Sequence, residues 1–129
     1  MRVTAELTDR PIPDGGFACD AEGEPGALVE FRGVVRGSED GRPIRALRYE
    51  AYEPMARREM ERILRELGKE HPCLAARVVH RHGLVRVGEA AILVQIQARH
   101  REAAFAMLAR FMDRLKEDVP VWKVEAVAA

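Results

Sequence analysis

Hydrophobic and polar residues alternate in several stretches of the first half of this chain, which is the pattern of strands with one buried face. The alternation predicts a first strand at 3–7 and two more at 27–35 and 44–52. A loop rich in proline, glycine and aspartate fills 10–26, and the polar segment 37–43 has the composition of a turn. We expect the two strands on either side of that turn to pair as a hairpin.

Two other stretches have the three- and four-residue spacing of amphipathic helices. The first begins at Pro54, whose fixed φ suits a first helical position, and ends near Gly68. The second covers about 102–118 and is stopped by Pro120. The apolar stripes that should face the core are Ala56, Met60, Ile63, Leu64 and Leu67 in the first helix, and Ala104, Leu108, Phe111, Met112 and Leu115 in the second.

Three further strands complete the pattern, at 76–82, 90–97 and 121–127, with a turn at 83–88. The predicted order is β-β-β-α-β-β-α-β, without an internal repeat, a low-complexity tract or a linker. This order predicts a single α+β domain over 1–129 with a largely antiparallel or mixed sheet.

Composition then excludes several classes of protein. The chain has 129 residues, enough for one domain with a sizeable core, and 47% of them are hydrophobic, too many for a disordered chain. Lys and Arg number 21, as do Asp and Glu, and this zero net charge argues against a general nucleic-acid binder. The longest apolar run, 90–94, is far too short for a membrane helix. The first residues lack the apolar core of a signal peptide, so we expect a cytoplasmic protein.

The cysteines and histidines give little sign of metal binding. Cys19 and Cys73 lie far apart without metal-ligand spacing, and a reducing cytoplasm favours free thiols, although one disulfide between them remains an open alternative. His80 and His82 stand two residues apart without a third ligand nearby. We therefore interpret both histidines as residues of a strand and expect neither a metal nor a cofactor.

The zero net charge is the sum of unlike segments. Residues 1–30 hold seven acids and two bases, whereas 31–48 hold five arginines and two acids. The segment 77–86 adds three arginines and no acid. Basic charge gathered in particular segments favours the recognition of a small anion.

Arg99, His100 and Arg101 stand at the predicted junction of a strand and the second helix. Free backbone N–H groups and the positive end of the helix dipole would meet these side chains there, an arrangement suited to a phosphate. A solvated basic turn is the alternative on spacing alone. Cations at a helix N-terminus disfavour the helix, however, and this local conflict points towards function.

Lys116 and Lys123 flank a short segment that contains Pro120 and the chain's single tryptophan. Two ammonium groups held close together would favour one neutral amine for acid–base work, although ordinary surface lysines are the alternative. Arg36 ends a predicted strand and enters a glycine-flanked loop, where binding residues concentrate. A surface arginine is the alternative for this residue.

Taken together and in order, several segments resemble the large, catalytic subunit of molybdopterin synthase. No single segment is decisive, but the set covers roughly 26–125 with compatible spacing and is highly specific. The matching segments are GALVEFRGVVR at 26–36, LRYEAYEPMA at 47–56, HRHG at 80–83, GE at 88–89, HREAAF at 100–105, DRLK at 113–116 and PVWKVE at 120–125.

The resemblance implies an α/β hammerhead fold with an added antiparallel sheet, and a homodimer at the centre of a heterotetramer. The other subunit would be a small ubiquitin-like sulfur carrier whose C-terminal Gly-Gly end bears a thiocarboxylate. The implied reaction transfers sulfur twice to cyclic pyranopterin monophosphate (precursor Z) and forms the dithiolene of molybdopterin. A carrier that brings its own activated sulfur is consistent with the lack of a nucleophilic cysteine motif in this chain.

The resemblance also implies roles for particular residues. Lys123 and Lys116 match the family's two active-site lysines, with Lys123 as the acid–base or thiocarboxylate-contacting group and Lys116 in support. Arg36, His100 and Arg101 match its basic pocket and would hold the cyclic phosphate and the pterin.

The chain departs from the family pattern at two places near these residues. Ala98 stands where a serine is frequent, and Val124 replaces a frequent basic residue. Two alternatives to the enzyme follow: a non-catalytic homologue that binds the pterin phosphate or the ubiquitin-like partner without turnover, and a generic phosphate-binding regulatory domain.

Overall fold

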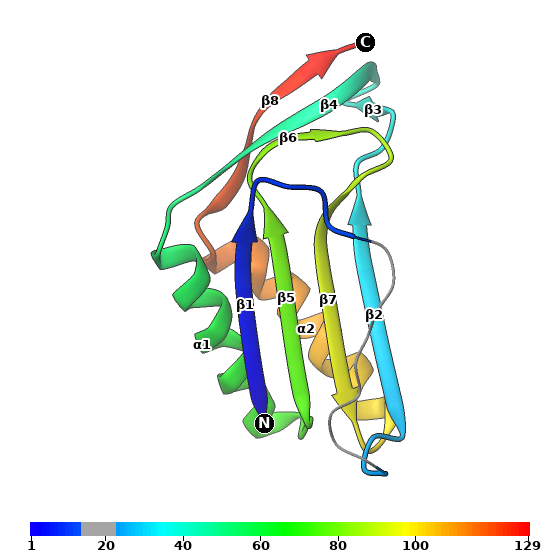
Figure 1. Ribbon diagram of the computed structural model, residues 1–129, viewed down its shortest axis with the longest axis vertical. Coiled ribbons are helices and arrows are strands. Elements are labelled where there is room, and N and C mark those ends of the chain that lie inside the picture. Colours follow the sequence, from blue (N-terminus) through cyan, green and yellow to red (C-terminus); the bar gives the residue numbers. More distant parts are fainter. Residues whose placement is uncertain (14–22) are drawn as a thin grey trace.

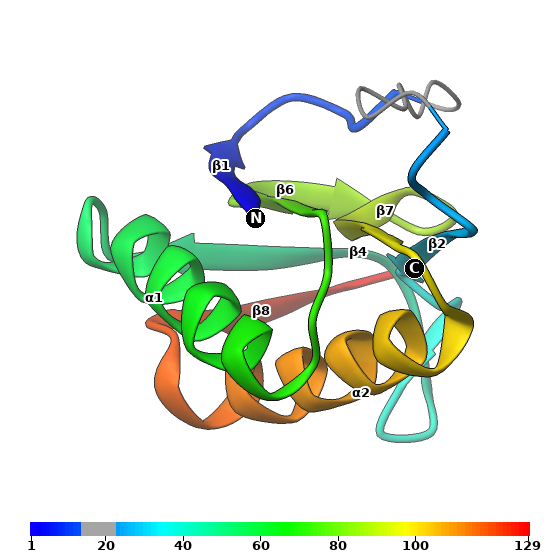
Figure 2. The same cartoon turned by 90° about the horizontal axis from the view of Figure 1, so that it is seen from below.

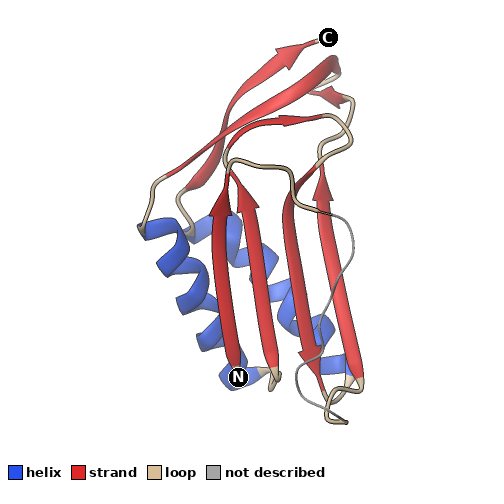
Figure 3. Ribbon diagram, viewed as in Figure 1, coloured by secondary structure: helices blue, strands red, loops and turns tan. Residues whose placement is uncertain are grey.

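A computed structural model describes residues 1–13 and 23–129, and these contain two helices and eight strands (Figures 1 and 3). Their α+β arrangement confirms the predicted fold class and adds two short strands, β3 and β6, to the predicted order. The elements are β1 (Arg2–Thr8), β2 (Ala27–Val34), β3 (Ser38–Glu39), β4 (Arg42–Ala51), α1 (Met55–Glu70), β5 (Ala75–Arg81), β6 (Gly83–Arg86), β7 (Ala90–Ala98), α2 (Arg101–Asp118) and β8 (Val121–Ala128).

The main sheet has the strand order β1-β5-β7-β2. β1 runs parallel to β5, and the other pairs are antiparallel, so the sheet is mixed as expected. Both helices lie on the same face of this sheet, α1 towards β1 and α2 towards β7 and β2 (Figures 1 and 2). Most of the core lies between the sheet and the two helices.

The apolar stripes of the helices form this core. All five stripe residues predicted for α1 are buried. In α2 the buried residues are Ala104, Met107, Phe111 and Leu115, and the predicted Leu108 and Met112 pack against the core only in part. Gly68 does not end α1, which continues to Glu70. A Cβ at Gly68 would meet the flexible end of the Met1 side chain, so the glycine leaves room for Met1 against this turn of the helix.

A second sheet is built around β4, which pairs antiparallel with β3, β6 and β8. It lies at one end of the main sheet, at the top of Figure 1. A smaller core cluster, Val35, Ile44, Leu47, Val85 and Ala91, packs against it. The cluster includes residues from both sheets, so it joins the second sheet to the first.

The predicted hairpin between 27–35 and 44–52 is wrong. β2 pairs with β7 in the main sheet, whereas β4 forms its hairpin with the two-residue β3. Asp40 and Gly41 join β3 to β4, and both have positive φ, as the tightest hairpin turns require. The turn signal at 37–43 was therefore real, but a local signal does not say which strand the returning chain will meet.

The predicted turn at 83–88 also contains structure that the sequence analysis missed. Its first four residues form β6, which pairs with the middle of β4. Arg81, next to this strand, is buried: it donates to Glu89 Oε1 at 3.1 Å and to the Leu84 carbonyl at 2.9 Å. Glu89 Oε1 also accepts the backbone N–H of Arg86 at 2.9 Å, and these hydrogen bonds lower the pKa of its carboxyl. The HRHG and GE motifs thus meet in one hydrogen-bonded corner.

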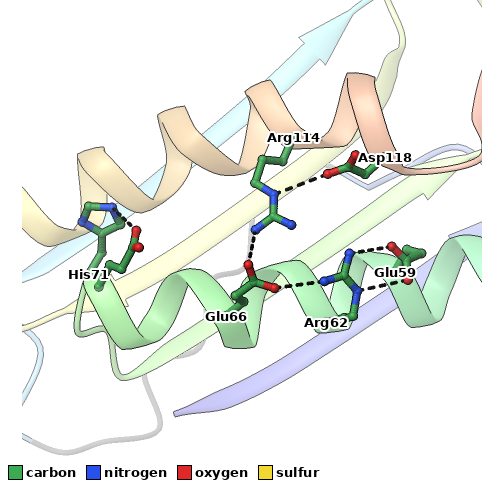
Figure 4. Close-up of polar contacts among 7 residues, drawn as sticks. Glu59, Arg62, Glu66, His71, Arg114 and Asp118 are labelled. Carbon is green, nitrogen blue, oxygen red and sulfur yellow. Dashed lines mark hydrogen bonds and ion pairs between the residues drawn. The ribbon is translucent and has the colours of Figure 1, made fainter.

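Charged side chains connect the exposed sides of the two helices (Figure 4). Arg62 donates to Glu59 and Glu66 within α1, at 2.8 Å and 2.9 Å. Arg114 of α2 donates to Glu66 at 3.0 Å and to Asp118 at 3.4 Å. The network therefore ties α1 to the C-terminal half of α2.

Candidate active site

A cavity of about 330 Å³ lies where the C-terminal end of α2 meets both sheets. The charged and aromatic residues that line it come from segments far apart in the sequence: Arg36, Glu39, Tyr49, His80, Lys116, Trp122 and Lys123. Three of the five residues assigned to a site from the sequence, Arg36, Lys116 and Lys123, thus share one cavity. The remaining lining is mostly apolar, which reduces solvation of any charged ligand inside and strengthens its attraction to these cations.

Local structure explains how the three cations converge. Lys116 lies in the last turn of α2, where a cation interacts favourably with the helix dipole. The chain then reverses through Pro120, and Lys123 lies on β8 opposite Tyr49 of β4. Arg36 lies two residues beyond the end of β2, and the last two residues of that strand line the same cavity.

In the described part of the chain, neither His100 nor Arg101 lines this cavity. His100 is the N-cap of α2 and Arg101 is its first residue, so both lie at the predicted junction, and the helix begins one residue before the expected start at about 102. Lys116 lies fifteen residues further along the helix, which at the usual rise corresponds to about 22 Å. Within one chain, the two groups of predicted site residues therefore stand at opposite ends of α2.

Two polar members of the cavity, Glu39 and Tyr49, were not predicted from the sequence. Glu39 Oε1 accepts a hydrogen bond from Lys123 Nζ at 3.3 Å. Burial and the nearby Glu39 carboxylate raise the pKa of the Tyr49 phenol. Glu39 has no motif around it, and Tyr49 lies in the matching segment 47–56 without a role predicted for it. The pairing of β4 with both β3 and β8 brings the two residues to the lysine.

His80 is buried and lines the cavity, with its ring centroid 5.7 Å from that of Tyr49 in an edge-on arrangement. Its Nδ1 lies 2.8 Å from the carbonyl oxygen of Arg81. A carbonyl can only accept, so the neutral ring carries its proton on Nδ1 and leaves Nε2 bare. Burial lowers the pKa of His80, and the neighbouring His82 lowers it further.

We expect this buried histidine to make stability depend on pH in the weakly acidic range. Since its folded-state pKa is depressed, the unfolded chain takes up the proton first as pH falls below about 6.5. The stabilisation is complete above that pH and is lost as pH falls through the folded pKa. Urea unfolding at about pH 7 and pH 5.5 should show a larger loss for the wild type than for His80→Asn, whose amide can still donate to Arg81.

Equal losses in the two proteins would contradict this account of His80. The carboxyls with lowered pKa, Glu30, Glu59 and Glu89, do not confuse the comparison, because their stabilisation is lost only below about pH 4.5.

The described residues offer little other chemistry. Cys73 is a free thiol that donates to the Ala103 carbonyl at 3.7 Å, and burial raises its pKa to about 11, so it is a poor nucleophile. Cys19 lies outside the described residues. Within 1–13 and 23–129, no three His, Cys, Asp or Glu side chains are placed to hold a metal ion. Neither described helix has the length and apolarity needed to cross a bilayer.

Known proteins share both this sequence and this fold. A catalytic subunit of molybdopterin synthase from Pyrococcus abyssi is 46% identical over 100 residues, 78% of this chain and 68% of that protein. The corresponding subunit from Bacillus subtilis is 36% identical over 121 residues, 93% of this chain and 77% of that protein.

Solved structures extend the comparison to the fold. Molybdopterin synthase from Staphylococcus aureus superposes with a TM-score of 0.83 at 28% identity, over 95% of this chain and 90% of that one. A complex of subunits 1 and 2 of molybdopterin-converting factor from Helicobacter pylori superposes with a TM-score of 0.67 at 23% identity, over 82% of this chain and 73% of that one. The second likeness supports the fold alone.

The family model described as "MoaE protein" matches residues 9–118, which is most of the chain, so the chain belongs to the MoaE family. The family assignment agrees with the two helices on one face of a mixed sheet and with the second, antiparallel sheet. The function of this chain is that of the catalytic subunit of molybdopterin synthase, an enzyme of molybdenum cofactor biosynthesis.

Proposed function

We propose that the cavity lined by Arg36, Lys116 and Lys123 transfers sulfur from the thiocarboxylate of a small carrier subunit to cyclic pyranopterin monophosphate. The observation that supports this assignment is the convergence of three cations from three separate segments on one cavity. The substrate phosphate, the attacking thiocarboxylate and the leaving phosphate oxygen are all anionic. Cations already in place can stabilise all three without reorganising during the reaction.

The two lysines divide the work in this proposal. Lys123 contacts the thiocarboxylate or transfers a proton. Its side chain lines the cavity from β8, and its Nζ already donates a hydrogen bond there, to Glu39. Lys116 supports it with a second positive charge from the end of α2. Arg36 binds the phosphate of the substrate, because its guanidinium is always charged and can donate hydrogen bonds to two oxygens at once.

The small ubiquitin-like carrier is the proposed partner, with its Gly-Gly end entering the cavity. The relatives that match this chain are named as catalytic subunits of molybdopterin synthase, and that name supports an assembly with at least one further subunit for this chain as well. A homodimer at the centre of a heterotetramer, and a cytoplasmic location, complete the proposal.

His100 and Arg101 fit this proposal through the homodimer. Because about 22 Å of helix separates them from Lys116 of the same chain, we propose that they serve the cavity of the second protomer. There they would hold the phosphate and the pterin beside the partner's lysines.

A mixing experiment tests this sharing of sites. Lys123→Ala and Arg101→Ala should each be nearly inactive, but mixed dimers made by co-expression should contain one intact cavity. A symmetric dimer assembled at random would then recover about a quarter of wild-type activity. Recovery near zero, with mixed dimers shown to be present, would place Arg101 and Lys123 of one chain in the same cavity and contradict the proposal.

A reconstituted conversion assay tests the overall function. This chain, the thiocarboxylated carrier and precursor Z should together yield molybdopterin, and omission of any one should abolish the product. Binding of precursor Z without turnover would instead favour the non-catalytic homologue. Failure to form a complex with any ubiquitin-like carrier would favour a phosphate-binding regulatory domain.

A further inference from the structure

One carboxylate lies among the cations of the cavity. Of the residues described as lining it, Arg36, Lys116 and Lys123 are cations and Glu39 alone is an acid. A site that receives anions is an unfavourable place for a fixed negative charge, because like charges repel strongly in a partly desolvated cavity. Membership of a solvated polar turn therefore does not by itself explain why a glutamate lines this cavity.

The backbone holds Glu39 in place. It is the last residue of β3, directly before the tight turn through Asp40 and Gly41, and it pairs with Arg42 of β4. β4 in turn pairs with β8, which carries Lys123. The short hairpin thus holds the carboxylate near the lysine. Burial and, to a smaller extent, the Glu39 carboxylate raise the pKa of Tyr49, which lines the same cavity.

The contact between Glu39 and Lys123 engages the ammonium group of the lysine. Lys123 Nζ donates to Glu39 Oε1 at 3.3 Å, and the glutamate side chain is 27% exposed against 53% for the lysine. An anionic group that approaches Lys123 therefore meets an ammonium whose charge is already partly neutralised. To accept the hydrogen bond that Glu39 now accepts, it must take the place of the carboxylate.

We propose that Glu39 acts as a counter-anion for Lys123. It forms an ion pair with Lys123 in the unliganded protein and is displaced from it by the anionic group of the incoming ligand. The proposal rests on the proposed function of the same cavity and specifies it further. A ligand must present an anionic oxygen or sulfur to Lys123, and it binds less tightly than the three cations alone would allow.

Glu39→Gln tests the proposal, because it keeps the size and hydrogen-bonding capacity of the side chain and removes its charge. The probe is inorganic pyrophosphate, titrated into the full chain without carrier or pterin. Trp122 lines the cavity and is the only tryptophan, so its fluorescence can report binding. We expect Glu39→Gln to bind pyrophosphate about three- to fivefold more tightly than the wild type, the range expected for releasing one partly exposed ion pair.

Asp40→Asn provides the matched control. It removes the same charge from the adjacent residue, which does not line the cavity, and asparagine tolerates the positive φ of this position. Its affinity for pyrophosphate should stay within about 1.5-fold of the wild type, since exposed charges outside the cavity are screened by salt. A gain in affinity equal to that of Glu39→Gln would indicate general repulsion and overturn the proposal.

A double-mutant cycle separates competition for Lys123 from simple repulsion. In a Lys123→Met background, Glu39 has no lysine to pair with and acts on pyrophosphate only by direct repulsion, so Glu39→Gln should improve binding by a smaller factor than in the wild-type background. An equal gain in both backgrounds, or no gain in the wild-type background, would overturn the role of Glu39. These outcomes leave the proposed function intact, because that function fails only if the wild-type chain does not convert precursor Z in the reconstituted assay.

Discussion

Replacing Lys123 with alanine should reduce molybdopterin formation by about a hundredfold or more, while leaving the protein folded. The side chain lines the cavity with 53% of its surface exposed, so its loss creates no hole in the core. A group that moves a proton or stabilises charge in a transition state typically contributes about two to four orders of magnitude in rate. Single-turnover formation of molybdopterin, with this chain and the thiocarboxylated carrier in excess over precursor Z, would measure the loss.

The chain supplies its own control, because it has only three lysines. Lys69 is exposed in the last turn of α1 and does not line the cavity, so Lys69→Ala should keep nearly full activity. Full activity of Lys123→Ala would remove this residue from the mechanism and leave Lys116 as the candidate. A loss in Lys123→Ala that Lys123→Arg restores would identify a requirement for charge, without proton transfer.

Replacing Phe111 with alanine should lower the free energy of unfolding by about 3–5 kcal/mol, the usual result of truncating a buried aromatic residue. Phe111 is fully buried, the largest such side chain of the described core, and lies between α2 and the main sheet. Urea unfolding followed by circular dichroism would measure the change. Because a loss of this size can prevent folding, Phe111→Leu should be measured too, with an expected loss of about 1–2 kcal/mol.

Phe105 on the same helix is the matched control for this prediction. Its side chain is 58% exposed, so Phe105→Ala removes the same atoms at little cost, within about 0.5 kcal/mol. If the two alanine variants were equally destabilised, the assigned orientation of α2 against the sheet would be wrong.

Much of the fold could be predicted from the sequence because the helices of this chain bury a regular stripe. The whole stripe predicted for α1 is buried, since a helix presents residues three and four apart on one face wherever it packs. Strand pairing is different. The partner of β2 is β7, about sixty residues later, and the turn next to β2 could not reveal it. Met107 was missed because α2 is bounded by the main sheet and α1 together, so its buried face is wider than one stripe.

The candidate site divides in the same way. Arg36, Lys116 and Lys123 were identified from residue type and from resemblance to a family, and the structure places them in one cavity. Their roles in the reaction, and the single domain expected over 1–129, stay predictions. Glu39 was not identified, because its importance comes from a contact across 84 positions of the chain.

The sequence by itself determined both helices and the six longer strands, the core residues of α1 and the residue types of the anion site, since periodicity and local chemistry are properties of short segments. Only the tertiary structure decided which strands pair and that Glu39 accepts a hydrogen bond from Lys123. It also placed His100 and Arg101 at the far end of α2 from the cavity. These outcomes depend on burial and packing between segments distant in the chain. The energy of such contacts depends on the whole fold, so it cannot be inferred from any short segment of the sequence.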